Sequence, residues 1–166
     1  MHLRLPRGGP ALQAGLALGM AVLGCDGGPA ATRVAEAEER PVADVLRVRV
    51  AGAAGAYTFR VTVRSPDRGC DRYADWWEVI RADGTLVHRR ILHHSHVDEQ
   101  PFTRGGGPVD LEPDERVFVR AHMHSAGYGG AAVAGTAEGG FERAELPADF
   151  APDLERAPPQ PEGCSH

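Results

Sequence analysis

The sequence predicts an all-β fold, a single antiparallel β-sandwich of about seven strands. Three segments, residues 46–50, 57–64 and 117–124, alternate apolar with polar side chains. Alternation with a period of two is typical of strands that bury one face. Turn residues separate the segments, and residues 43–146 show no helical period. Short alternating strands punctuated by turns are the pattern of a β-sandwich.

The other strands are expected between and after these segments. Residues 74–81 (ADWWEVIR) and 85–92 (TLVHRRIL) are joined by Ala82-Asp83-Gly84. An Asp-Gly pair between two apolar-patterned segments indicates a β-hairpin. Residues 109–111 and 131–136 are weaker strand candidates, and together these segments bring the expected total to about seven strands.

One stretch resembles a known family. Residues 111–121 (LEPDERVFVRA) resemble the E–F corner and F strand of fibronectin type III domains, although Val117 stands where those domains carry a tyrosine. Trp76 or Trp77 in the third strand also suits the core of such a domain. The resemblance implies an immunoglobulin/fibronectin-III-like antiparallel β-sandwich with strand order A-B-C-C′-E-F-G. It implies no activity, because this fold hosts many unrelated functions.

The first 24 residues carry the features of an export signal. Two arginines precede an apolar stretch, residues 11–24, which is shorter than the roughly 20 residues that a membrane span needs. The stretch ends in Val22-Leu23-Gly24-Cys25, which resembles the lipobox of bacterial lipoproteins. The resemblance implies a diacylglyceryl group on Cys25 that anchors the protein to the inner or outer membrane, on the extracytoplasmic side of the cell envelope. The alternative is an ordinary signal peptide cleaved near residues 30–31.

These features divide the chain into four parts. They are a signal peptide (residues 1–24), a lipidated tether (25–42), a β-sandwich domain (43–146) and a proline-rich tail (147–166) that we expect to be extended.

The chain contains no lysine and has a net charge of −5. The lack of lysine excludes a P-loop and a Schiff-base enzyme. No nucleic-acid partner is expected, because an acidic domain without a basic run binds nucleic acid poorly.

Two cysteines remain once Cys25 carries lipid. Cys70 and Cys164 would meet an oxidising compartment, where two thiols usually form a disulfide. Closing so long a loop would stabilise the folded state by up to about 4–5 kcal/mol. We therefore expect a disulfide that holds the tail against the domain, with free thiols or metal ligands as the alternatives.

Histidines gather in residues 93–96 and 122–124. His94 and His96 share one side of an extended strand, as do His122 and His124. With the strand order above, the connections after the second, fourth and sixth strands lie at one pole of the sandwich. That pole would hold both histidine segments together with Asp67, Asp71 and Asp75. Imidazoles and carboxylates can bind zinc or copper, and the best candidate ligands are His94, His96, His122 and Asp98. The alternative is a solvated polar surface without a metal.

Three functions are compatible with this pole. The first is a non-enzymatic binding module that takes a divalent metal, or that binds a protein or an envelope component through Tyr73, Trp76, Phe102 and Tyr128. The second is a metal-dependent hydrolase or a copper-handling protein, and the third is a purely structural envelope lipoprotein. No catalytic residue is expected, because no serine lies in a G-x-S-x-G motif and no H-E-x-x-H motif is present. The sequence favours the binding module.

Overall fold

The computed structural model describes residues 39–165, which lie within one compact unit, Glu38–His166. The predicted signal peptide, Cys25 and most of the predicted tether fall outside the described residues. In the described part of the chain, no helix has the length and apolar character needed to cross a bilayer.

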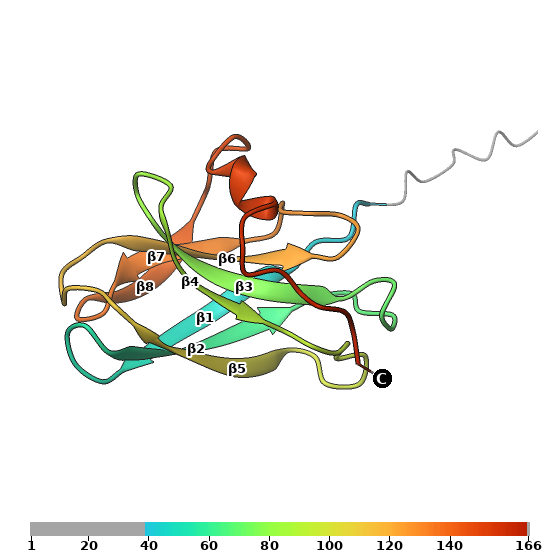
Figure 1. Cartoon of the computed structure of the whole chain (residues 1–166), viewed down its shortest axis with the longest axis horizontal. Helices are drawn as coiled ribbons and strands as arrows, with labels where there is room; N and C mark the ends of the chain where they lie inside the picture. The colour runs from blue at the N-terminus through green and yellow to red at the C-terminus, as the bar shows by residue number, and fades with distance from the viewer. Residues whose placement is uncertain (1–38, 166) are drawn as a thin grey trace, which may run out of the picture. The chain divides into compact units, whose positions relative to one another are not determined.

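Two antiparallel sheets form the domain, and the predicted fold class is confirmed (Figure 1). The first sheet has the order β1-β2-β5 and the second the order β4-β3-β6-β7-β8. The strands are β1 (Asp44–Ala51), β2 (Tyr57–Arg64), β3 (Ala74–Arg81), β4 (Leu86–Ile91), β5 (Phe102–Val109), β6 (Val117–Met123), β7 (Ala132–Thr136) and β8 (Gly140–Ala144). The first two strands pair along their length, from Asp44 opposite Arg64 to Ala51 opposite Thr58.

The alternation seen in the sequence sets which side chains enter the core. In β2 every second residue from Tyr57 to Val63 is buried, and the residues between them are exposed or half-buried. β3 differs, because its first seven residues are all buried. Its inward face carries Trp77, which is fully buried in the core between the sheets. A strand buried on both faces must be covered from outside as well.

Two strands were not predicted, and both lack a clear alternating pattern. The expected strand at residues 109–111 is wrong, because β5 ends at Val109 and contains three consecutive glycines. A Cβ atom on Gly106 would lie 2.7 Å from both His88 Nε2 and Trp77 Cη2, so a glycine is needed where these rings approach the backbone. β8 is an edge strand without a fully buried residue, and it gives no apolar signal.

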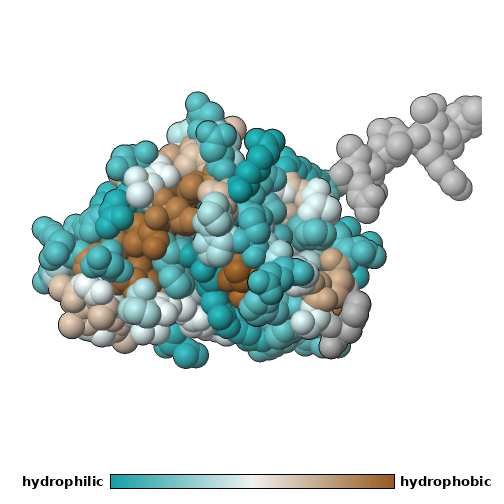
Figure 2. Space-filling view, in the orientation of Figure 1, coloured by the Kyte–Doolittle hydropathy of each residue, from teal (hydrophilic) through white to brown (hydrophobic). Residues whose placement is uncertain are grey.

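The C-terminal segment, residues 147–165, covers the outer face of the second sheet and is called the strap here. It crosses in front of β3 and β4 (Figure 1). A single 3-10 turn, Pro152–Glu155, interrupts the extended chain that the sequence predicted, and no residue of this turn is buried. The predicted disulfide is present, and it joins Cys164 of the strap to Cys70 in the connection after β2. The face seen in Figure 2 is mostly hydrophilic, with an apolar band beside the strap.

Candidate functional site

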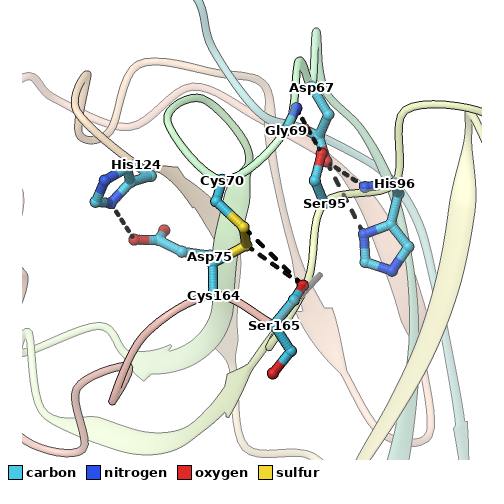
Figure 3. The surroundings of a disulfide bond; sticks show 9 residues. All are labelled: Asp67, Gly69, Cys70, Asp75, Ser95, His96, His124, Cys164 and Ser165. Carbon is cyan, nitrogen blue, oxygen red and sulfur yellow. Dashed lines mark hydrogen bonds and ion pairs between the residues drawn. A yellow bond between two sulfur atoms is a disulfide. The ribbon is translucent and has the colours of Figure 1, made fainter.

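Three connections meet at one pole of the sandwich, as the strand order predicted. The connections after β2 and β4 are joined by the carboxylate of Asp67, which accepts a hydrogen bond from the His96 backbone N–H at 2.8 Å. Ser95 Oγ accepts a second bond from the Gly69 N–H at 3.2 Å. After β6, the His124 N–H donates to the Tyr73 carbonyl at 2.8 Å. Figure 3 shows these segments around the disulfide.

The centre of the candidate site is a buried imidazole between two carboxylates. His122 Nδ1 lies 2.6 Å from Asp75 Oδ1, and His122 Nε2 lies 3.5 Å from Glu155 Oε1 on the strap. Asp75 and His122 are buried, whereas the Glu155 side chain is half exposed. Asp75 also lies 3.7 Å from the ring of His124, which is itself half exposed. The Asp75 contact fixes the orientation of the His122 ring and turns Nε2 toward the strap.

Aromatic rings hold His122 in place. The Trp76 indole stacks on the His122 ring, with 3.7 Å between centroids and an interplanar angle of 6°. Tyr128 meets the same imidazole edge to face at 4.9 Å. Burial, together with the negative charge of Glu78, raises the pKa of Tyr128 well above its ordinary value, so the Tyr128 hydroxyl stays protonated.

A buried ionic network lies beside this imidazole on the same face. Glu78 is fully buried at the middle of β3, between Arg89 of β4 and Arg120 of β6. Arg89 donates to Glu78 Oε2 from Nε at 2.8 Å and from Nη2 at 2.6 Å, and Arg120 Nε donates to Oε1 at 2.8 Å. Two buried cations share one anion, so the remaining guanidinium N–H groups need neutral acceptors.

The strap supplies those acceptors from its backbone. Arg89 donates to three strap carbonyls and Arg120 to two. The acceptors are the carbonyls of Phe150, Ala151, Leu154, Ala157 and Pro159. The guanidinium of Arg120 also lies 3.5 Å from the centroid of the Tyr128 ring, and that of Arg89 lies 4.5 Å from the centroid of Trp76. Burial of the charged network therefore depends on the strap.

A cleft of about 640 Å³ opens between the strap and the pole. Its lining includes Tyr73, Asp75, His122 and His124 from the sheet side, and Glu155 with Cys164 from the strap side. His122 Nε2 and the Glu155 carboxylate thus face each other across a concave surface. A concave site with a few fixed polar groups is the usual form of a small-ligand site.

The predicted metal ligands are divided between two places. His94 and His96 lie together, with 4.6 Å between ring centroids, and the His96 ring stacks on Phe102 at 3.7 Å. His122 is instead engaged by Asp75 and Trp76. None of the predicted ligands, Asp98 included, belongs to a group of three or more His, Cys, Asp or Glu side chains that could hold a metal ion within residues 39–165. Zinc sites in proteins take at least three such ligands.

The predicted aromatic surface is largely internal. Tyr73, Trp76 and Phe102 are 2 %, 2 % and 1 % exposed, so they cannot offer an open surface to a partner in this conformation. Tyr128 is half-buried beneath Arg120. Trp76 and Tyr128 belong to the candidate site, whereas Phe102 packs in the core beneath His96.

Sequence reasoning missed Glu78, Arg89, Arg120 and Glu155. In the sequence the first three are ordinary polar positions of alternating strands, and nothing near them in the chain indicates burial. The available signal was the pair of tryptophans before Glu78, since two adjacent large aromatic residues suit a strand buried on both faces.

Comparison with known proteins finds one similar protein. The chain is 40% identical over 124 residues to a protein of Halomicrobium mukohataei named "Putative lipoprotein". The chain is therefore similar to a protein named as a lipoprotein. The matched region covers 72% of this chain and 61% of the relative, so the chain spans less than two thirds of that protein. No family model matches the chain, and no solved structure matches it.

Proposed function

We propose that this protein is a lipoprotein and an extracytoplasmic binding module, anchored to a membrane through lipid on Cys25. We propose further that it takes a small hydroxyl-bearing envelope component in the cleft beside the disulfide. The observation that carries the proposal is the pairing of His122 Nε2 with Glu155 Oε1, 3.5 Å apart at the cleft. A ligand hydroxyl can donate to the Glu155 carboxylate, and it can accept from or donate to His122 Nε2 according to the tautomer of the ring, because a hydroxyl carries both functions.

The site is built to hold these two groups in place before a ligand arrives. Asp75 and Trp76 fix the His122 ring, and the disulfide with the Arg89 and Arg120 bonds fixes the strap that carries Glu155. A ligand that meets fixed polar groups loses less free energy to ordering the site.

The surroundings of His122 favour binding over catalysis. The ring contacts two carboxylates and two aromatic rings, and no hydroxyl or thiol nucleophile within residues 39–165 bonds to it. Covalent catalysis would need such a nucleophile within hydrogen-bond reach of the base. Cys70 and Cys164, at the rim of the cleft, are consumed by the disulfide.

Ligand binding can be tested by NMR on residues 38–166, a fragment that holds all eight strands, the core and the disulfide. Glycerol, glucose and N-acetylglucosamine serve as soluble hydroxylated probes. We expect a probe to shift resonances of His122, His124 and Trp76, and Glu155→Gln to weaken that response. Glu162→Gln, at an exposed strap position, is the matched control. Probes that leave the cleft resonances unmoved, or an equal effect of both variants, would refute this ligand class.

The anchor is tested on the full chain in a bacterial host. We expect metabolic labelling with a radioactive fatty acid to mark the wild-type protein in the membrane fraction, and Cys25→Ser to remove the label. Unlabelled wild-type protein, or label that persists in Cys25→Ser, would refute lipidation at this residue.

A further inference from the structure

The outer face of the β1-β2-β5 sheet is strongly basic, although the whole chain carries a net charge of −5. These three strands contain five arginines and a single acidic residue, Asp44. Asp44 is engaged by Arg64 at 3.1 Å, and Arg104 is engaged by Glu99 at 2.7 Å. Three arginines are left, and they are Arg47, Arg49 and Arg60.

Strand register brings these three side chains together. Arg49 stands directly opposite Arg60, and Arg47 stands opposite Thr62, whose partner on the other side is Thr103. Cross-strand partners lie on the same face of a sheet, and the residues between them, such as Val48 and Val61, point into the core. The three arginines therefore share the outward face, and all three are exposed.

No carboxylate neutralises this cluster from within the domain. Among residues 39–165, Arg47, Arg49 and Arg60 make no ion pair or side-chain hydrogen bond. Like charges directly opposite each other on neighbouring strands destabilise a sheet. The repulsion between Arg49 and Arg60 would be relieved by an anionic surface placed against this face.

An exposed apolar residue lies within the same strand. Leu46 occupies the irregularity in the pairing between Val45 and Arg47, and its side chain is 41% exposed. Only one other large hydrophobic residue in the described part of the chain, Val97, is exposed to this degree. Basic side chains are attracted to anionic headgroups, and an apolar side chain beside them can be buried in the interface between headgroups and acyl chains.

We propose that this face, formed by Arg47, Arg49 and Arg60 with Leu46 at its edge, docks on the anionic phospholipid headgroups of a bilayer. Only 18 residues separate Cys25, the proposed lipidation site, from Asp44, the first residue of β1. A chain spans at most about 3.5 Å per residue, so an anchor at Cys25 would keep this face within reach of the membrane. Lipid on one cysteine and a basic patch on the domain would then act as two signals for the same surface.

Vesicle co-sedimentation of residues 38–166, without any lipid anchor, tests this docking separately from lipidation. The probes are vesicles of pure phosphatidylcholine and of an equimolar phosphatidylcholine–phosphatidylglycerol mixture. Each arginine near an anionic surface is expected to strengthen binding by about 5-fold, so the triple variant Arg47→Gln/Arg49→Gln/Arg60→Gln should bind the anionic vesicles about 100-fold more weakly than wild type. Binding should also weaken as salt is added, because salt screens exposed charges.

The matched control is Arg68→Gln/Arg90→Gln/Arg143→Gln, which removes three exposed arginines from outside the β1-β2-β5 sheet. This control has the same net charge as the triple variant, and we expect it to retain most of the wild-type binding. An equal loss in both variants would show that net charge rather than this face governs binding, and would overturn the proposal. Wild-type binding to the phosphatidylcholine vesicles that is as strong as binding to the anionic vesicles would overturn the proposal as well. Binding to soluble polyphosphate without binding to anionic vesicles would instead assign the face to a soluble anionic polymer.

Discussion

The carboxylate of Glu78 accepts two hydrogen bonds from the guanidinium of Arg89, at 2.8 Å from Nε and 2.6 Å from Nη2, and both side chains are fully buried. The remaining Arg89 donors end on carbonyls of the strap. This pair therefore links the centre of β3 to the C-terminal segment. It is the point at which the stability of the sandwich and the position of Glu155 at the candidate site are coupled.

Replacing Glu78 by Gln should lower the free energy of unfolding by about 3–5 kcal/mol, because it leaves two buried arginines without their anion. Urea denaturation followed by tryptophan fluorescence measures the change. Glu99→Gln breaks the exposed pair with Arg104 and is the matched control, which we expect to leave stability nearly unchanged. Similar urea midpoints for Glu78→Gln and Glu99→Gln would mean that the buried network stabilises the domain no more than an exposed ion pair does.

Removing the disulfide with Cys70→Ser/Cys164→Ser should lower the free energy of unfolding by about 2–5 kcal/mol. The cause is the freedom that the unfolded chain regains, since the bond joins residues 94 positions apart. Wild-type protein treated with dithiothreitol should show the same fall in chemical denaturation. A double variant as stable as the oxidised wild type would contradict a stabilising role for this bond.

Gly106→Ala should destabilise the domain by about 1–3 kcal/mol, because the new methyl group overpacks the space beneath His88 and Trp77. Gly105→Ala is the matched control, since its Cβ would have only the Phe59 carbonyl oxygen within 4 Å, at 3.8 Å. Thermal unfolding of the two variants makes the comparison. A control that loses as much as Gly106→Ala would point to a general effect of glycine in β5.

Stability should fall as the pH drops below about 6.5, the ordinary pKa of histidine. Burial, followed by the positive charges of Arg104 and His94, lowers the pKa of His96 in the folded state, and burial also lowers the pKa of His88. Between the two pKa values the unfolded chain therefore binds a proton that the folded chain does not. This loss is absent above about pH 6.5 and grows as the pH falls toward the folded-state pKa.

His96→Phe keeps a flat ring against Phe102 and removes one of these titrations, so its stability should depend less on pH than that of wild type. Urea denaturation on either side of pH 6.5 provides the measurement. His93→Gln, at an exposed position, should keep the wild-type pH dependence. An unchanged pH dependence in His96→Phe would exclude His96 as a source of the effect.

Calorimetric titration with zinc and copper tests the predicted metal site. Because His94 and His122 lie in different surroundings, we expect no stoichiometric site that both His94→Ala and His122→Ala abolish. One metal bound per chain and lost in each variant would show that the two histidine segments share ligands after all.

The sequence by itself predicted a disulfide between Cys70 and Cys164, with free thiols or metal ligands as the alternatives, and it determined the class of fold and the pole at which three connections meet. The reason is that strand alternation reports burial residue by residue. Connections at alternate ends of antiparallel strands also bring Asp67, His96 and His124 to the same end.

Only the tertiary structure decided what the outward faces of the two sheets do. Glu78 and Arg120 are 42 residues apart, and register across β3 and β6 places them in contact. The strap then buries that face, although alternation alone would leave its polar residues in water. On the other sheet, no segment within residues 39–165 covers Arg49 and Arg60. The same alternating pattern therefore leaves two like charges exposed and opposite each other. Alternation in a strand specifies which side chains share a face, whereas pairing and covering segments from distant parts of the chain decide what that face meets.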